Sequence, residues 1–227
     1  MQGFRFAFSP VAWGGHVEFT VSPWYIEKNI QEAPNTKLFL IRHGQTTGNL
    51  KRGTYCGQTD VPLTELGRHQ AEQIRPILAR HRFDRVFSSD LIRAIDTQRI
   101  ALPGIEGERT ALLREIDVGS LAGRTRVEIV AQYGEDSIKN GDYVAFGGEN
   151  RRLACDRVRK FLSALEQDPC DNVAVFAHNG ILNCVMEIVL KAEFDRSATL
   201  SPNCAIHVYE FDGSRWKLLA WNYMCEI

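Results

Sequence analysis

The chain has 227 residues, a length that suits one large domain or one domain with an appendage. Hydrophobic residues make up 44% of it and charged residues 24%, which is enough for a buried core beneath an ordinary polar surface. The formal net charge of -1 excludes a general basic field, so neither nucleic acid nor a membrane is expected as a partner. Any site for an anion must therefore be a local cluster of Arg and His.

The cysteines and the N-terminal segment bear on the cellular compartment. Six cysteines are scattered without a Cys-x-x-Cys pair, which indicates neither a zinc knuckle nor a disulfide framework and suits a reducing cytosol. No stretch approaches the roughly 20 apolar residues of a membrane span. Pro10 and the glycines at 14–15 interrupt the apolar start, which argues against a secretory signal. We expect a cytoplasmic protein; whether it forms a homo-oligomer is left open.

Residues 1–36 differ from the rest of the chain. They contain seven aromatic residues with several Pro and Gly, and they show no sustained periodicity. Alternation from His16 to Val21 predicts one short strand. We expect an N-terminal extension of unknown role over 1–36, followed by the main domain over 37–227.

Three short segments beyond residue 36 are predicted to be buried strands, and the first of them is a continuous apolar run typical of a strand buried on both faces. They cover residues 38–41, 84–87 and 172–177, and each ends in a polar cluster: 42–44 (RHG), 88–90 (SSD) and 178–180 (HNG). Thr110 to Leu113 is predicted as another short extended segment. Residues 205–211 and 216–221 are predicted to form a hairpin around Asp212 and Gly213.

Helical patterns alternate with these strands. Helices are predicted from Thr64 to about His81, from an Asp90 cap to about Ala101, over 128–133, over 149–167 and over 181–191. This alternation is typical of an α/β three-layer sandwich with a mostly parallel central sheet and helices on both faces.

The polar clusters at the strand ends predict a binding site. Ligands of open α/β sheets bind at the carboxyl ends of the strands. If the three predicted strands are neighbours, their ends bring four side chains into one crevice: Arg42, His43, Arg93 and His178. Arginine forks match phosphate oxygens, so the expected guest is a dianion. Each residue alone could be an ordinary structural group, and only the set points to a site. A metal site of His43, His178 and Glu115 is the alternative, but Arg42 would repel a cation.

The residues of these clusters belong to five short sequence motifs, here called blocks, that follow one another along the chain. The blocks are 40–49 (LIRHGQTTGN), 60–64 (DVPLT) with Gly67 and 70–71, 88–94 (SSDLIRA) with Thr97, 113–115 (LRE) with Gly119 and Gly123, and 177–180 (AHNG). The set resembles the histidine phosphatase superfamily, the phosphoglycerate-mutase-like group, and its branch of small phosphatases such as α-ribazole phosphatase. The resemblance covers residues 37 to about 222.

The resemblance implies a phosphoric monoester hydrolase of the histidine acid phosphatase type. His43 would be the nucleophile that forms a phosphohistidine, and Glu115 the acid that protonates the leaving alcohol. Arg42, Arg93 and His178 would bind the phosphoryl group. The remaining pocket residues would be Asn49, Cys56, Gly57 and Asn179. The substrate would be a small phosphate ester, and no cofactor or metal would be required.

Some positions leave alternatives open. Asn179 stands where the family usually has a smaller residue, Asp117 is a lesser candidate acid, and the 147–149 segment (GGE) resembles a substrate-side loop. Cys56 is either an oxidant-sensitive thiol with a pKa lowered by Arg42 or an inert filler.

Two other functions compete with a phosphatase. A phosphoglycerate mutase would need basic residues for the substrate carboxylate, and Arg124, Arg126, Arg151 and Arg152 keep that alternative open. A non-catalytic phosphate-binding module would not need Glu115.

Overall fold

The computed structural model describes residues 9–13, 16–20, 35–50, 53–192 and 201–223, apart from the side chains of 9–20, 49, 139 and 140. The chain divides into two units between Pro34 and Asn35. The first unit contains an antiparallel hairpin of β1 (Ser9–Trp13) and β2 (His16–Thr20). The predicted strand from His16 is therefore present as β2, and its expected last residue, Val21, lies outside the described residues.

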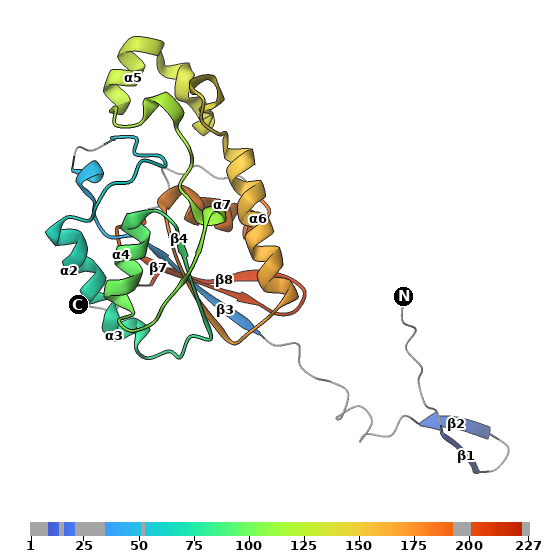
Figure 1. Ribbon diagram of the computed structural model, residues 1–227. Helices are drawn as coiled ribbons and strands as arrows, with labels where there is room; N and C mark the ends of the chain where they lie inside the picture. Colours follow the sequence, from blue (N-terminus) through green and yellow to red (C-terminus); the bar gives the residue numbers. More distant parts are fainter. Residues whose placement is uncertain (1–8, 14–15, 21–34, 51–52, 193–200, 224–227) are drawn as a thin grey trace. The chain divides into compact units, whose positions relative to one another are not determined.

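The second unit is built on a six-stranded sheet in the order β5-β4-β6-β3-β7-β8 (Figure 1). The strands are β3 (Thr36–Arg42), β4 (Arg85–Ser89), β5 (Glu108–Thr110), β6 (Asn172–Ala177), β7 (Ile206–Phe211) and β8 (Trp216–Tyr223). The first four strands of this order are parallel, while β7 and β8 are antiparallel to their neighbours. The predicted mostly parallel sheet and C-terminal hairpin are confirmed.

Helices occupy the connections between strands. The α-helices are α2 (Glu65–Gln73), α3 (Arg75–Leu78), α4 (Ile92–Ala101), α5 (Arg126–Tyr133), α6 (Arg151–Gln167) and α7 (Asn179–Leu190). Short 3₁₀ helices cover Thr47–Asn49, Ala111–Leu113, Gly119–Leu121, Glu135–Gly141 and Val144–Phe146. The loop at residues 53–55 and the start of α5 are joined by backbone hydrogen bonds, among them Tyr55 N–H to the Arg124 carbonyl at 2.9 Å.

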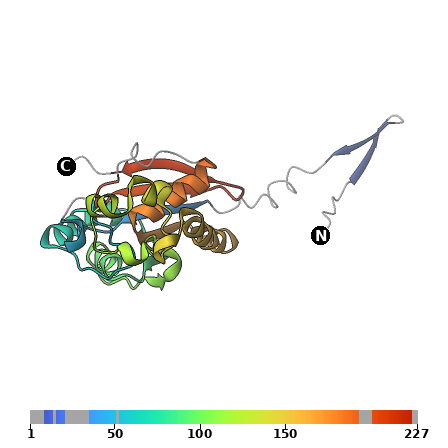
Figure 2. The ribbon, with the colours of Figure 1, turned by 90° about the horizontal axis from the view of Figure 1, so that it is seen from above.

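The sheet separates two hydrophobic cores, as the alternation of β3 shows. Leu38 and Leu40 pack in a core with α6 and α7, whereas Phe39 and Ile41 pack in a core with α2, α3 and α4. Successive side chains of a strand point to opposite faces, so a continuous apolar run buries both. Figures 1 and 2 show the two helical layers on either side of the sheet. The three-layer prediction is confirmed.

The helix predicted from Thr64 to about His81 is shorter and broken. Thr64 caps α2 by accepting a hydrogen bond from the Gly67 amide at 3.0 Å, but α2 ends at Gln73 and α3 begins at Arg75. Pro76 lies at the start of α3, where its missing N–H is tolerated. Inside a continuous helix its ring would collide with the preceding turn. The break is therefore the local effect of one proline.

Asp90 does not cap α4, contrary to the prediction. Its carboxylate instead accepts two hydrogen bonds from Arg114, at 2.8 and 2.7 Å, and the N-cap residue is Leu91. The Ile92 amide at the start of α4 donates to the Asp60 carboxylate at 2.7 Å. The stabilising acceptor thus comes from a distant loop, which local helix-capping rules cannot identify.

The segment predicted as extended over residues 110–113 is also shifted. The strand β5 ends at Thr110, and Ala111 to Leu113 forms a 3₁₀ helix whose first turn Thr110 caps. The Thr110 hydroxyl accepts from the Leu112 amide at 3.2 Å, a local bond that competes with continued extension.

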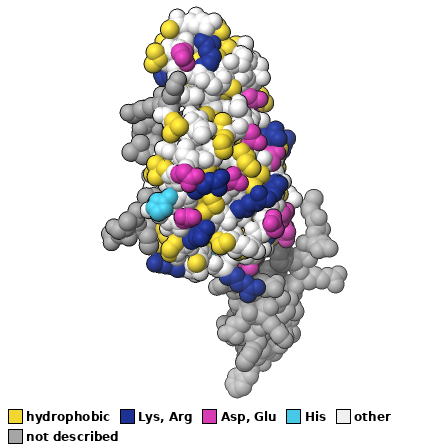
Figure 3. Space-filling view, turned by 60° about the vertical axis from the view of Figure 1, so that its left-hand side comes forward, with side chains coloured by type: hydrophobic (Ala, Val, Ile, Leu, Met, Phe, Trp, Pro, Cys, Tyr) yellow, Lys and Arg dark blue, Asp and Glu magenta, His cyan; other side chains and the backbone are white. Residues whose placement is uncertain are grey.

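The surface carries mixed charge on the face drawn in Figure 3, where basic and acidic side chains are interspersed among hydrophobic ones. Within the described residues, no helix combines the length and apolar character that a membrane crossing requires.

Candidate active site

Three adjacent parallel strands end at one edge of the sheet and place the predicted groups together. β3 ends in Arg42 and leads to His43, β6 leads to His178, and β4 leads to α4, which carries Arg93 in its first turn. The imidazole rings of His43 and His178 lie 5.1 Å apart between centroids. Both rings and the Arg93 side chain are almost fully buried. The structure thus brings these residues into one cluster.

The hydrogen bonds of His43 define its tautomer. Its Nδ1 lies 2.7 Å from the Gly44 carbonyl oxygen, which can only accept, so Nδ1 carries the hydrogen and Nε2 carries a lone pair. Two hydrogen bonds hold the backbone of His43. The His43 amide donates to the Ala177 carbonyl at 3.0 Å, and the Asn203 side-chain amide donates to the His43 carbonyl at 2.9 Å. The ring is therefore fixed with a bare nitrogen.

Arg93 orients His178. Its Nε donates to His178 Nδ1 at 3.1 Å, so the hydrogen of the neutral imidazole is on Nε2. Its two terminal nitrogens donate to the carbonyls of Thr59 and Gly57 at 2.8 and 2.7 Å. The His178 Nε2 and Arg42 Nε atoms are buried with no hydrogen-bond partner. Buried donors without acceptors are costly, and a phosphoryl oxygen would satisfy both.

Burial and charge keep both imidazoles neutral. Desolvation lowers the pKa of His43 and of His178 well below the usual value, and Arg93 lowers each further. Burial also lowers the pKa of the Arg42 and Arg93 guanidinium groups, but from so high a value that both stay cationic. The cluster therefore combines two fixed positive charges with two uncharged rings.

Glu115 lies at the rim of this cluster, where backbone amides orient its carboxylate. Oε1 accepts from the Ile116 amide at 2.9 Å and from the Gly180 amide at 3.1 Å, and Oε2 accepts a longer bond of 3.3 Å from Gly180. A Cβ at position 180 would collide with Oε1. Gly180 therefore belongs to the site because it lets the start of α7 approach the carboxylate.

Arg157 braces the segment that carries Glu115. It donates to the carbonyls of Leu112 and Glu115 at 2.8 and 3.1 Å and forms a half-buried ion pair with Glu149 at 2.6 Å. Glu149 in turn accepts from the Asp117 amide at 3.0 Å. Sequence reasoning missed Arg157, because one arginine among several on α6 carries no motif.

This brace assigns a structural role to the segment at residues 147–149. A Cβ at Gly148 would collide with the Asp117 carbonyl, so the glycine allows close backbone contact, and Glu149 binds Arg157. The Asp117 carboxylate accepts from the Gly119 amide at 2.9 Å and does not line the pocket beside Glu115.

A pocket of about 200 Å³ opens next to Glu115. Its lining residues are Thr54, Tyr55, Cys56, Gly57, Glu115, Ile116, Val118, Tyr143, Asn179 and Gly180. Three expected pocket residues, Cys56, Gly57 and Asn179, are thus placed at it, while the side chain of Asn49 lies outside the described residues.

The oxidant-sensitive alternative for Cys56 is wrong in its premise. Burial raises the pKa of the Cys56 thiol, and the nearby Arg93 opposes this only in part. A thiol with a raised pKa forms little thiolate, which is the reactive species.

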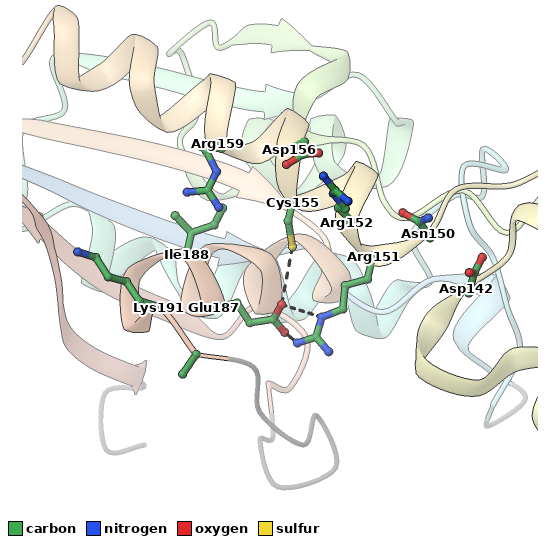
Figure 4. A pocket seen from close by; sticks show the side chains of 11 residues that line it. Asp142, Asn150, Arg151, Arg152, Cys155, Asp156, Arg159, Glu187, Ile188 and Lys191 are labelled. Atoms are coloured by element: carbon green, nitrogen blue, oxygen red, sulfur yellow. Dashed lines mark hydrogen bonds and ion pairs between the residues drawn. The ribbon is translucent and has the colours of Figure 1, made fainter.

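A larger pocket of about 900 Å³ lies beside α6 and α7 (Figure 4). Glu187 accepts a hydrogen bond from Arg151 at 2.7 Å there, and the Cys155 thiol lies 3.7 Å from the same carboxylate. This pocket contains none of the residues predicted for the site.

The profile of the histidine phosphatase superfamily (branch 1) matches residues 38–224. The chain belongs to the histidine phosphatase superfamily. The match begins in β3 and ends beyond β8, so it spans the sheet and the cluster at its edge.

Relatives of this histidine phosphatase superfamily member include both phosphatases and mutases. A 2,3-bisphosphoglycerate-dependent phosphoglycerate mutase of Cytophaga hutchinsonii is 34% identical, over 66% of this chain and 75% of the relative. The adenosylcobalamin/alpha-ribazole phosphatase of Salmonella typhimurium is 31% identical, over 68% and 79%. A mycobacterial glucosyl-3-phosphoglycerate phosphatase structure is similar with a TM-score of 0.72 and 30% identity, covering 83% of this chain and 99% of that one.

His207 lies behind the cluster and makes a pH-dependent contribution to stability. Its Nδ1 accepts from the Asn222 amide at 3.1 Å, so Nε2–H donates to the Ser201 hydroxyl at 2.9 Å, and Arg42 donates to the Ser201 carbonyl. Burial, with a smaller effect of Arg42, lowers the pKa of His207 to about 3. The folded protein therefore holds this imidazole neutral.

We expect the free energy of unfolding to fall as the pH decreases from about 6.5, the usual His pKa, because the unfolded chain then binds a proton that folded His207 rejects. Between pH 6.5 and 4.5 this residue should account for about 2 kcal/mol of the loss. Urea unfolding of wild type and His207→Gln across this range measures it. The same pH dependence in both proteins would contradict the assignment.

Proposed function

We propose that this superfamily member is a phosphomonoesterase that works through a phosphohistidine on His43. The observation that carries the proposal is the juxtaposition of a bare His43 Nε2 with the buried donors of Arg42 and His178. Arginine and imidazole donors stabilise the charge on the equatorial oxygens of a transferring phosphoryl group. A neutral imidazole beside them is a nucleophile that needs no prior deprotonation.

In the first step, the lone pair of His43 Nε2 attacks phosphorus while the bond from phosphorus to the ester oxygen breaks. The leaving alkoxide takes a proton from Glu115, which lies at the rim of the cluster. Oε2 is the oxygen suited to hold this proton, because Oε1 already accepts the two shorter amide bonds. The products are a free alcohol and phosphohistidine.

In the second step, the Glu115 carboxylate accepts a proton from water as that water attacks phosphorus. The phosphorus–nitrogen bond breaks, and orthophosphate leaves with His43 and Glu115 restored. Two guanidinium groups supply the charge that a metal would otherwise provide, so we propose that turnover is metal-independent.

The placement of four arginines favours phosphatase over mutase. Arg124 lies over the Tyr133 ring, Arg126 pairs with Glu135, and Arg151 pairs with Glu187. Arg152 lines the larger pocket beside α6. Arg124, Arg151 and Arg152 are thus engaged away from the pocket beside Glu115, and Arg126, which also hydrogen-bonds Tyr55 in the lining of that pocket, is shared with Glu135.

A mutase is the second candidate, because relatives at similar identity are named phosphoglycerate mutases. Two reaction rates distinguish the phosphatase from the mutase: phosphate release from several monoesters, and interconversion of 3- and 2-phosphoglycerate in the presence of 2,3-bisphosphoglycerate. Measuring both rates with and without EDTA also tests whether turnover needs a metal. We expect phosphate release that EDTA leaves intact and no interconversion at a comparable rate. Faster interconversion would favour the mutase, and phosphate binding without turnover would favour a binding module.

A further inference from the structure

Glu115, the acid of the proposed mechanism, lies in a stretch of backbone outside the regular elements. Residues 114–118 connect the 3₁₀ helices Ala111–Leu113 and Gly119–Leu121 and belong to no helix or strand. Two backbone amides orient the carboxylate of Glu115, but its main chain lacks the support that a helix or a strand would give. The position of the acid must therefore be set by groups from other parts of the fold.

Arg157 on α6 supplies such a group, and all three nitrogens of its guanidinium donate. Nη1 donates to the Leu112 carbonyl at 2.8 Å, and Nη2 donates to the Glu115 carbonyl at 3.1 Å. Nη2 and Nε also donate to the Glu149 carboxylate, at 2.6 and 3.3 Å. A guanidinium is a rigid planar fork, so it fixes these three acceptors relative to one another.

Glu149 extends this contact to the other side of the acid. Its carboxylate accepts from the Asp117 amide at 3.0 Å, and its own amide donates to the Asp117 carbonyl at 2.9 Å. The Arg157 and Glu149 side chains are only 15% and 16% exposed, so solvent screens the ion pair weakly. Gln58 also donates to the Glu115 carbonyl, at 3.2 Å, but without a charge. The ion pair thus contacts the chain before, at and after the acid.

The nucleophile and the phosphoryl donors are held by different contacts. Two hydrogen bonds fix the main chain of His43, and Arg93 donates to two backbone carbonyls and to His178. The charge of Arg157 contributes to the lowered pKa of His178, but desolvation and Arg93 contribute more and do not depend on it. Loss of the pair between Arg157 and Glu149 should therefore displace the acid while the cluster keeps its geometry.

We propose that Arg157, through its ion pair with Glu149, is the positioning residue of the acid: it holds Glu115 where the carboxyl group can protonate the leaving oxygen. The proposal rests on the proposed function, since it concerns the acid of that reaction. Arg157 contacts no reacting atom and acts only through Glu115. A displacement of about 1 Å can cost about 10²-fold in rate, which is within the contribution expected of a general acid.

The test removes both members of the pair together, so that no lone charge is left buried. In the double variant Arg157→Met/Glu149→Gln, glutamine can still accept from the Asp117 amide. Rapid quench then measures the phosphorylation step for an alkyl ester, glycerol 2-phosphate, and for p-nitrophenyl phosphate. We expect a loss of about 10- to 100-fold for the alkyl ester and less than about threefold for the aryl ester, whose leaving group needs little protonation. Equal proportional losses would overturn the proposal.

A second ion pair on α6 provides the matched control. Arg151 pairs with Glu187 on α7, and their side chains are 20% and 10% exposed, so Arg151→Met/Glu187→Gln removes the same charges at similar burial. This pair lies beside the larger pocket. We expect the control to change both esters alike. A selective loss for the alkyl ester in the control as well would show that removal of any such pair has this effect, and would overturn the proposal.

A double-mutant cycle tests whether Arg157 acts through the acid. In a Glu115→Gln background, Arg157→Met/Glu149→Gln should slow the alkyl ester by less than about threefold further, because the group that it positions is already absent. A further loss as large as in wild type would overturn the proposal. Wild type that releases phosphate from neither ester would contradict the proposed function instead. Release from the aryl ester alone would leave Glu115 without a leaving group to protonate and would overturn the inference.

Arg157→Lys keeps the test valid if the double variant does not fold. Lysine retains the positive charge, but its single nitrogen cannot replace the three donors of the fork. We expect the same selectivity with a smaller loss, about 3- to 10-fold for the alkyl ester and little change for the aryl ester. Wild-type rates with both esters in this variant would overturn the proposal. Urea unfolding of each variant verifies that the assayed protein is folded.

Discussion

His43→Ala is expected to lower phosphate release from every ester by on the order of 10⁴-fold or more, because it removes the group that becomes covalently linked to phosphorus. The bare Nε2 of His43 has no substitute in the cluster, since His178 is held by Arg93 with its hydrogen on Nε2. Steady-state phosphate release measures the loss. Rapid quench with radiolabelled ester should show an acid-labile phosphoenzyme in wild type and none in the variant.

Two controls separate loss of the nucleophile from loss of the fold. His69→Ala changes an exposed histidine on α2 and should leave turnover unchanged. The His43→Ala protein should still bind inorganic phosphate in calorimetry, because Arg42, Arg93 and His178 remain. Turnover within tenfold of wild type would remove His43 from the proposed mechanism.

Glu115→Gln is expected to cause a loss that depends on the leaving group. An alkyl phosphate needs its leaving oxygen protonated, so its phosphorylation step should slow by about 10²- to 10⁴-fold. p-Nitrophenolate leaves with little protonation, and the same step should slow much less for p-nitrophenyl phosphate. Glutamine can still accept from the Ile116 and Gly180 amides, so the rim should stay in place. Rapid quench with both esters measures each phosphorylation step.

The second half-reaction gives an independent readout. Water also loses its base in Glu115→Gln, so phosphohistidine should accumulate during turnover of the aryl ester. Asp117→Asn is the matched control, because Asp117 bonds the Gly119 amide and should affect both esters alike. Equal proportional losses for aryl and alkyl esters in Glu115→Gln would reassign the acid, and a leaving-group dependence in Asp117→Asn would identify Asp117 in its place.

Features determined over a few residues were predicted well. The apolar runs before Arg42 and His178 became neighbouring strands within a residue or two of the expected bounds. Helix bounds were also close wherever a local cap decides them, as at Thr64. Local rules failed where a distant group provides the partner: Asp60 rather than Asp90 bonds the first turn of α4, and no pattern in the sequence links them.

Some features of the candidate site could likewise be predicted from the sequence, and others depended on the tertiary structure. Residue identity and position after a strand were enough to nominate Arg42, His43, Arg93 and His178, because parallel strands end at one edge of a sheet. The acid role of Glu115 came only from the resemblance to the family. Only the tertiary structure decided which nitrogen of each histidine is bare, since that depends on acceptors and donors such as Gly44 and Arg93.

The residues that surround the site show the same contrast between local and tertiary information. The sequence by itself determined that a phosphate-sized cluster of cations would form, because the charges are carried by the residues themselves. The brace from Arg157 and the raised pKa of the Cys56 thiol were decided only by folding. Burial and charge pairing are properties of the surroundings, and segments far apart in the chain supply those surroundings.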